Sequence, residues 1–276
     1  MTVRRIMHMS DLHFGRTDPE IVSAVQRSAQ QLAPDLIAIS GDLTQRARER
    51  EFVQAQAFLH TLPDPKIVVP GNHDVPLYNI VARFLAPLER YKRIVSMETE
   101  PSFVDDEIIV VGVNTARSLV FKGGRINREQ VKRVARMFCG ASSQQVRILV
   151  THHPFDLPHG GDSTDLVGRA AMAISSLREC APDVLLAGHV HEPGTGTTAE
   201  HYDLGGHSSI IVQAGTATST RVRGSPNSFN LIQLDHSDVA VERFEWSTSS
   251  RAFSRSSTCS FTRRMGAWAR VNAVGR

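Results

Sequence analysis

The segment KIVVPGNHD, residues 66–74, joins a strand-like apolar run to three adjacent polar side chains. β-Branched residues dominate its first half and favour an extended strand. A Pro-Gly pair then ends the strand in a turn, and Asn72, His73 and Asp74 come directly after it. A Gly-Asn-His-Asp sequence by itself is compatible with an Asx-type turn, so its meaning depends on the residues at the ends of the other strands.

Apolar runs and helix-like segments alternate along most of the chain. Strands are predicted at residues 3–9, 35–40, 66–70, 107–113, 146–151, 183–187, 208–214, 228–234 and 239–246. Helices are predicted at residues 19–33, 46–61, 77–91, 127–139 and 165–180. Several runs are continuously apolar, as is typical of strands covered on both faces, and the alternation favours an α/β layered core. The last strands succeed one another through turns, which predicts a second, more antiparallel sheet.

The length of 276 residues and the composition, 41% hydrophobic and 21% charged, are typical of one large globular domain. We assign residues 1–246 to that domain. No apolar run approaches the ~18 residues that cross a bilayer, and the N-terminus lacks the apolar core of a signal peptide. Cys139, Cys180 and Cys259 have no CxxC spacing, so we predict isolated thiols without a disulfide framework, in a reducing, cytoplasmic environment.

Positive charge is concentrated at the C-terminus. Residues 247–276 contain six arginines and no lysine, aspartate or glutamate. The whole chain has 31 basic and 28 acidic residues, so 25 against 28 remain in residues 1–246 and the net charge there is −3. The main domain therefore shows no bulk basic signal for nucleic acid. The basic, Ser/Arg-rich C-terminal extension is either a floppy end or a segment held to the body by aromatic residues such as Phe261 and Trp268.

Polar, metal-ligating residue types come directly after five of the predicted strands. They are Asp11 and His13 in SDLHFG, Asp42 in SGDLT, Asn72, His73 and Asp74 in PGNHD, His152 and His153 in THHPF, and His189 and His191 in GHVH. Ligands of open α/β sheets bind at the carboxyl ends of the strands. Each motif alone is common by chance, but five in succession, each after a strand, predict one shared site.

Aspartate, histidine and asparagine are ligands of borderline divalent metals. Asp11 and His13 are two residues apart, as are His189 and His191, so in extended backbone each pair points to one side. Two ions ~3.5–4 Å apart that share a carboxylate would use all seven candidate ligands, which are too many for one ion. The candidates are Asp11, His13, Asp42, Asn72, His152, His189 and His191. The set contains no cysteine, which argues against a closed structural zinc site.

The five motifs, in this order, resemble those of the calcineurin-like metallophosphoesterases over roughly residues 4–235. The resemblance implies a four-layer α/β/β/α sandwich of two mixed sheets flanked by helices. It also implies roles for the residues of the site. Asp11, His13 and His191 would bind the first metal, Asn72, His152 and His189 the second, and Asp42 would bridge them. His73 would be a catalytic residue that faces the phosphoester, with Asp74 placed to orient it.

The implied reaction is hydrolysis of a small phosphoester by a metal-bridging hydroxide, with two divalent ions as cofactors. Mixed nitrogen and oxygen ligands suit Mn, Fe, Zn, Co or Ni. The layout looks most like that of bacterial class III cyclic-nucleotide phosphodiesterases, so we expect a cyclic nucleotide or similar small diester. One alternative is a UDP-2,3-diacylglucosamine-type pyrophosphatase. The other, of a different class, is a non-catalytic metal-binding interaction scaffold.

Three further features bear on the substrate site, and the first two allow two interpretations each. Residues 77–100 could form a cap, in which the helix at 77–91 either packs on the core or contacts substrate. Arg221 and Arg223 are either solvated hairpin residues or ligands for a phosphate group. His153 could line the substrate pocket beside the metal ligand His152.

Overall fold

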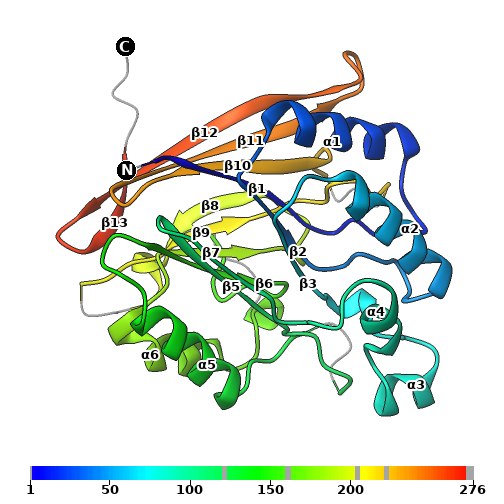
Figure 1. Cartoon of the computed structure of the whole chain (residues 1–276), viewed down its shortest axis with the longest axis horizontal. Helices are drawn as coiled ribbons and strands as arrows, with labels where there is room; N and C mark the ends of the chain where they lie inside the picture. The colour runs from blue at the N-terminus through cyan, green and yellow to red at the C-terminus, as the bar shows by residue number, and fades with distance from the viewer. Residues whose placement is uncertain (1, 120–122, 159–162, 203–205, 221–223, 272–276) are drawn as a thin grey trace.

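The computed structural model describes residues 2–119, 123–158, 163–202, 206–220 and 224–271. Two mixed β-sheets pack face to face, and helices cover their outer faces (Figure 1). The predicted α/β/β/α sandwich is therefore confirmed. None of the helices in these described ranges is long and apolar enough to cross a bilayer.

The first sheet has seven strands in the order β13-β12-β11-β10-β1-β2-β3. Its strands are β1 (Arg4–Met9), β2 (Leu36–Ser40), β3 (Lys66–Val69), β10 (Ser228–Leu234), β11 (Asp238–Ser247), β12 (Ala252–Arg264) and β13 (Ala267–Val271). β1, β2 and β3 are parallel, whereas β10 to β13 pair antiparallel. Because β1, β2 and β3 are parallel, their carboxyl ends lie at the same end of the sheet.

The second sheet has six strands in the order β4-β5-β6-β7-β9-β8. Its strands are β4 (Ser102–Val104), β5 (Ile108–Val113), β6 (Val146–Thr151), β7 (Val184–Ala187), β8 (Gly194–Thr197) and β9 (Ile210–Gln213). β5, β6, β7 and β9 are parallel. Their continuous apolar sequences are explained by burial on both faces.

Three apolar layers hold the sandwich together. Strand residues such as Ile6 and Ile148 meet between the sheets. The outer face of the first sheet packs against α1 (Pro19–Leu32) and α2 (Glu49–Thr61), and that of the second against α5 (Arg128–Cys139) and α6 (Ala170–Ser176). Asp18 caps α1, because its Oδ1 accepts a 2.8 Å hydrogen bond from the Glu20 amide.

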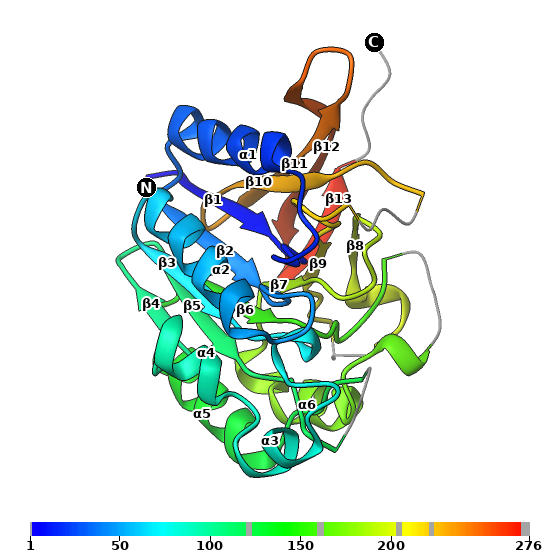
Figure 2. The same cartoon turned by 90° about the vertical axis from the view of Figure 1, so that its right-hand side faces the viewer.

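The nine predicted strands are all present, within two residues at each end. The predicted helix at 77–91 is instead two short helices, α3 (Ile80–Leu85) and α4 (Glu89–Ile94), because Pro87 cannot continue a helix. The predicted helix at 165–180 reduces to α6 and 3-10 turns at Ser163–Asp165 and Arg178–Cys180. Figure 2 shows α3 at the end of the molecule opposite the β11–β12 hairpin.

The C-terminal extension is a structured part of the first sheet up to Val271. Phe261 and Trp268 are buried, and the Trp268 indole Nε1 donates a 3.0 Å hydrogen bond to Oδ1 of Asp183. Arg263 reaches the same carboxylate oxygen at 2.7 Å. Asp183 directly precedes β7, so the extension links the two sheets. The floppy-end interpretation is therefore wrong for residues 247–271.

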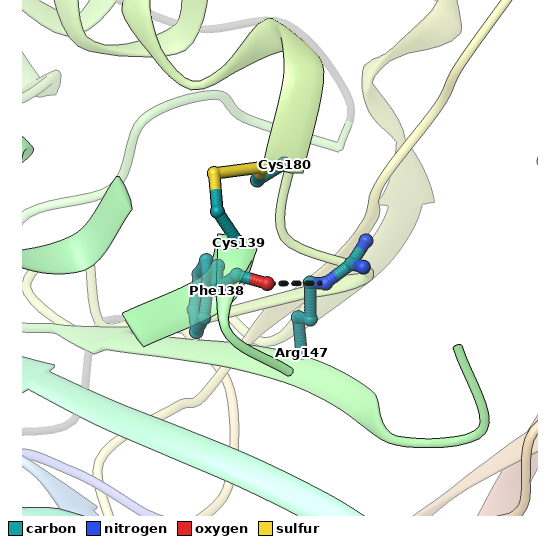
Figure 3. Close-up of a disulfide and its surroundings, with 4 residues drawn as sticks. All are labelled: Phe138, Cys139, Arg147 and Cys180. Atoms are coloured by element: carbon teal, nitrogen blue, oxygen red, sulfur yellow. Dashed lines mark hydrogen bonds between the residues drawn. A yellow bond between two sulfur atoms is a disulfide. The ribbon is translucent and has the colours of Figure 1, made fainter. Parts of the chain in front are cut away.

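A disulfide joins Cys139, the last residue of α5, to Cys180 (Figure 3). The prediction of isolated thiols is wrong for this pair, and the argument for a reducing compartment loses its basis. The two residues are 41 apart in sequence, with Cα atoms 5.2 Å apart. Only the packing of α5 beside the turn at Arg178–Cys180, on the same face of the second sheet, brings them together. Cys259 is a free thiol.

Candidate metal centre

The loops after β1, β2, β3, β6 and β7 meet where the ends of the two sheets come together. All seven candidate ligands lie in this one cluster: Asp11, His13, Asp42, Asn72, His152, His189 and His191. Their side chains converge from both sheets, which places the site across the interface between the layers. The sequence prediction of one shared site thus agrees with the geometry.

Asp11, His13 and His191 form one group of ligand atoms. Oδ1 of Asp11 lies 3.1 Å from Nε2 of His191 and 3.5 Å from Nε2 of His13, and the two Nε2 atoms are 3.4 Å apart. All three side chains are buried. Oδ1 of Asp11 receives no hydrogen bond in the described part of the chain. Three electron-rich atoms around a common point suit a cation.

Asn72, His152 and His189 form the second group. Oδ1 of Asn72 lies 3.0 Å from Nε2 of His152 and 3.1 Å from Nδ1 of His189. An amide oxygen and two imidazole nitrogens are donors that suit the same borderline metals.

Asp42 lies between the two groups. Its Oδ2 is 3.4 Å from Nε2 of His152 in the second group and 3.9 Å from Nε2 of His13 in the first. Its other oxygen, Oδ1, accepts a 2.8 Å hydrogen bond from the backbone amide of His73. A carboxylate in this position can touch two cations at once, which is the arrangement of a two-metal site.

Backbone carbonyls set the tautomers of two ligand histidines. Nδ1 of His152 lies 2.7 Å from the Ser40 carbonyl, and Nδ1 of His13 lies 3.3 Å from that of Thr44. Because a carbonyl only accepts, each Nδ1 carries the proton and each Nε2 turns its lone pair toward the cluster. Such outer hydrogen bonds are the usual support of metal-binding histidines. The residues present therefore fit two divalent ions.

Five of the seven candidate ligands have a left-handed backbone. The φ angles are 54° at Asp11, 50° at His13, 53° at Asp42, 78° at His189 and 64° at His191. Non-glycine residues rarely adopt this conformation, and each instance costs on the order of 1 kcal/mol or more. Strain of this kind persists only where the surrounding structure imposes it, and it concentrates at functional sites.

Glycines allow the ligand loops to approach one another. A Cβ at Gly188 would lie 1.8 Å from the Ser10 hydroxyl oxygen, and one at Gly71 would lie 2.1 Å from Oδ1 of Asp42. Both contacts are far inside van der Waals distance, so no larger residue fits there.

The sequence family is decided by a match over most of the chain. A family model described as calcineurin-like phosphoesterase matches residues 4–193. The chain belongs to this family. Phosphoesterases of this family act on phosphoester bonds and use divalent metal ions. No curated protein matches the chain in sequence.

Solved structures share the fold of this metallophosphoesterase at low sequence identity. A purple acid phosphatase from yellow lupin seeds has a TM-score of 0.69 at 14% identity, covering 93% of this chain and 53% of its own. PhoD has a TM-score of 0.71 at 10% identity, covering 100% and 72%. Plasmodium GAP50 has 0.62 at 10%, covering 97% and 91%. The metallophosphoesterase thus spans about half the length of the lupin phosphatase chain.

His73 lies beside the first group of ligands without belonging to it. Its ring centroid is 4.9 Å from that of His13, and its Nδ1 lies 2.7 Å from the carbonyl of Gln45. The carbonyl accepts, so Nδ1 is the protonated nitrogen. Gln45 therefore sets the orientation of the His73 ring.

Asp74 does not orient His73 as expected. Its carboxylate accepts hydrogen bonds from the amides of Gly71, Leu43 and Thr44, at 2.9, 3.1 and 2.9 Å, and from the Thr44 hydroxyl at 2.9 Å. Successive side chains of the 3-10 turn at Asn72–Asp74 point to different sides, so Asp74 is directed into the loop after β2. Its function is to hold the loop that carries Asp42.

Burial and charge act in opposite directions on the ionisable ligands of the metallophosphoesterase. Burial acts to raise the pKa of Asp42, yet the surrounding histidines, His152 foremost, hold that pKa well below its ordinary value. Burial acts to lower the pKa of His152, but the Asp42 carboxylate raises it to about 9. Burial lowers the pKa of His189 to about 4. Asp42 and His152 thus form a buried ion pair, in which a metal cation can take the place of the proton.

Of the three predicted substrate contacts, the structure describes only His153. His153 is fully buried, with Nδ1 2.8 Å from the Thr115 hydroxyl and its ring 4.5 Å from that of His189. It packs behind a metal ligand and does not line an open pocket. Arg221 and Arg223 lie outside the described residues.

Sequence reasoning missed the residues that support the ligands from outside. Thr44 and Gln45 come directly after the Gly-Asp-Leu motif, so their position was a usable signal. Thr115 lies just after β5, the strand next to β6, and offered no motif of its own. Asp165 Oδ1 lies 3.9 Å from Nε2 of His189, and it too has no local signature.

Proposed function

We propose that this metallophosphoesterase hydrolyses a phosphodiester, with a cyclic nucleotide or a similar small diester as its substrate. The observation that carries the proposal is the position of Asp42 between two complete groups of metal ligands. The small-diester substrate is favoured by the layout of the motifs, which looks like that of the class III cyclic-nucleotide phosphodiesterases.

The proposed ligand assignment uses the two groups. Asp11, His13 and His191 hold one ion, Asn72, His152 and His189 hold the other, and Asp42 bridges. Mn, Fe or Zn fits this donor set. When bound, the ions activate a water molecule and neutralise charge that develops on the phosphoryl oxygens. Thr44, Ser40 and Asp74 hold the ligand loops and tautomers in place before substrate arrives.

His73 is the proposed proton donor to the leaving oxygen. With Nδ1 donating to Gln45, Nε2 is the atom that would meet the phosphoester. Histidine is the side chain that most often transfers protons in catalysis, so His73 can give a proton to the leaving group and recover one from water. In its cationic form it would also stabilise charge on the phosphoryl group. Its backbone amide is tied to Asp42, which keeps it at the edge of the metal site.

A second candidate is a UDP-2,3-diacylglucosamine-type pyrophosphatase. The observation that favours it is a run of exposed apolar side chains at residues 77–85, immediately after the His73 turn. Acyl chains of a lipid-linked substrate would suit such a surface. The non-catalytic alternative has one analogy, because Plasmodium GAP50 is described as an anchor. The complete ligand set argues against it here.

One set of assays separates these functions. Purified protein supplied with Mn²⁺, Fe²⁺ or Zn²⁺ is tested on bis(p-nitrophenyl) phosphate, cyclic AMP and UDP-2,3-diacylglucosamine. We expect turnover of the first two. Turnover of the lipid-linked pyrophosphate without turnover of cyclic AMP would select the second candidate. No hydrolysis of any substrate, with two metals bound per chain, would select the scaffold.

A further inference from the structure

The helix α3 buries its charged side chain and exposes its apolar ones, which is the opposite of an ordinary amphipathic helix. Its one buried side chain is a charged one, Arg83, which is 2% exposed, whereas Val81 and Leu85 are 68% and 81% exposed. The α3 patch consists of the exposed apolar side chains of this segment: Leu77, Tyr78, Ile80, Val81, Phe84 and Leu85. The interpretation in which the helix at 77–91 packs on the core is therefore wrong for its first half. The second half does pack, through Leu88 and Tyr91.

Specific hydrogen bonds hold α3 in this orientation. Nε of Arg83 donates a 2.7 Å hydrogen bond to the Ser118 carbonyl, and Nη1 donates a 3.0 Å hydrogen bond to that of Pro76. Burial of a guanidinium is tolerated only when it is well paired. The helix is thus fixed with its apolar side chains outward, and turning it inward would break these bonds.

The α3 patch adjoins the metal centre. Pro76, whose carbonyl binds Arg83, lies three residues after His73 in sequence. The guanidinium carbon of Arg46 lies over the Tyr78 ring, 5.3 Å from the ring centroid. Arg46 directly follows Gln45, whose carbonyl orients His73. Figures 1 and 2 both show α3 at one end of the molecule, outside the layers of the sandwich. A surface that contacts this patch would therefore lie beside the loops that carry His73 and Gln45.

Positive charge surrounds the α3 patch. Besides the buried Arg83, residues 75–95 contain three basic residues, Arg90, Lys92 and Arg93, and one acidic residue, Glu89. Lys92 and Arg93 of α4 are exposed, as is Arg46 across the patch, and Arg93 is paired with Glu49 at 2.9 Å. A hollow of 330 Å³ between α2 and the two short helices is lined by Arg90 and Arg93, with Glu49 and Glu89 also at its wall. Apolar side chains at the centre and arginine and lysine at the border are the composition of a membrane-surface segment.

From this arrangement we infer that the α3 patch docks on an anionic lipid surface and brings the metal centre to face it. A contiguous exposed apolar patch beside basic residues has a physical use at such a surface, where the side chains enter the acyl boundary and the cations meet lipid phosphates. A second copy of the chain is a poorer occupant. A twofold contact through the patch would set Arg46, Lys92 and Arg93 close to the same cations of the partner. The inference does not depend on which phosphodiester is hydrolysed.

The test is sedimentation with vesicles of phosphatidylcholine, alone or mixed with phosphatidylglycerol, in the absence of substrate. We expect the metal-loaded protein to bind the mixed vesicles and to bind neutral ones weakly. A Val81→Asp/Leu85→Asp variant should bind the mixed vesicles at least about tenfold more weakly, because it places charge where the acyl boundary is entered. Both positions are exposed, so the fold tolerates the change. Val53→Asp, at an exposed position on α2, is the matched control and should bind like the unmodified protein.

Hydrolysis of bis(p-nitrophenyl) phosphate is measured on the same samples without vesicles and should be the same for all three proteins. Absence of this activity in the unmodified protein would count against the proposed function alone, because vesicle binding is measured separately. Absence of vesicle binding by the unmodified protein, or equal binding by the double variant, would overturn the docking inference. So would light scattering that shows a dimer converted to a monomer by the double variant, because the patch would then be an interface between copies.

Discussion

The backbone amide of His73 donates a 2.8 Å hydrogen bond to Oδ1 of Asp42, whose other carboxylate oxygen lies between the two groups of metal ligands. The proposed bridging ligand and the proposed proton donor are thus joined directly. A change in the position of Asp42 would move both the metals and the histidine. Metal binding and proton transfer can nevertheless be separated by experiment, because the bond to Asp42 uses the backbone of His73 and not its ring.

Replacing Asp42 with asparagine tests the bridge. The amide side chain would keep an oxygen that accepts from the His73 backbone but would lose the charge that holds two cations together. We expect metal content, measured by plasma emission spectrometry, to fall from two ions per chain to one or fewer. Hydrolysis of bis(p-nitrophenyl) phosphate should fall at least ~100-fold, since the ions supply several kcal/mol of charge stabilisation. Asp106→Asn, at an exposed turn, is the control. Two ions retained by Asp42→Asn would show that Asp42 is not the bridge.

Replacing His73 with alanine should remove proton transfer and leave the metals in place. General acid catalysis contributes about 10²- to 10⁴-fold, so the rate should fall within that range while two ions remain bound. The rate of hydrolysis should fall less for a substrate whose leaving group needs no proton, such as p-nitrophenolate, than for a substrate with an alkoxide leaving group. Equal losses for both substrates would contradict the role of His73 as a proton donor.

Much of this site was predictable because its residues obey a local rule. Each ligand comes directly after a continuous apolar run, so the strand and its polar end can be read together. In contrast, β8 (Gly194–Thr197) has the sequence GTGT, which carries no apolar pattern. It is a strand because its backbone pairs with β9, and that pairing has no local signal in the sequence. β12 was missed because much of it is exposed, so polar residues occupy it without alternation.

Other features depend on contacts that are distant in sequence. Cys139 and Cys180 meet only after α5 and α6 have packed on the second sheet. Asp74 was assigned to its neighbour in sequence, yet it serves the loop after β2. The outward face of α3 was unpredictable from periodicity, because the same apolar pattern describes a helix that packs on the core. Burial of Arg83 reverses its orientation.

Removal of the metals should lower stability. The ligand oxygen and nitrogen atoms converge at the site, and the loops that carry them have strained backbones. Bound cations would attract these atoms and so offset the cost of bringing them together and of the backbone strain. A ligand present at about 100 times its dissociation constant stabilises a protein by about 2.7 kcal/mol. For a chain of this size that corresponds to a rise in Tm of about 5–10 °C. Thermal unfolding is measured with and without EDTA, with Asp42→Asn as the control, which should respond less. An unchanged Tm after complete metal removal would contradict this coupling.

The C-terminal extension should contribute strongly to stability. Truncation of a buried tryptophan typically costs about 3–5 kcal/mol, and Trp268→Ala would also remove the donor to Asp183. We expect a large decrease in the denaturant midpoint, whereas activity of the folded variant on bis(p-nitrophenyl) phosphate stays unchanged because Trp268 is not a ligand. Met265→Ala, at the fully exposed turn between β12 and β13, is the control and should be near neutral. If the two variants unfold at the same denaturant concentration, the extension does not support the body.

The Cys139–Cys180 bond makes a prediction about both thiol count and stability. Denatured, unreduced protein should react with one equivalent of a thiol reagent, at Cys259, and reduced protein with three. Opening a loop of 41 residues removes about 4 kcal/mol in the chain-entropy account, so Cys139→Ser should unfold at a lower denaturant concentration. Cys259→Ser leaves the disulfide intact and should unfold like the unmodified protein. Three reactive thiols before reduction would show that the bond does not form, and the variants should then be equally stable.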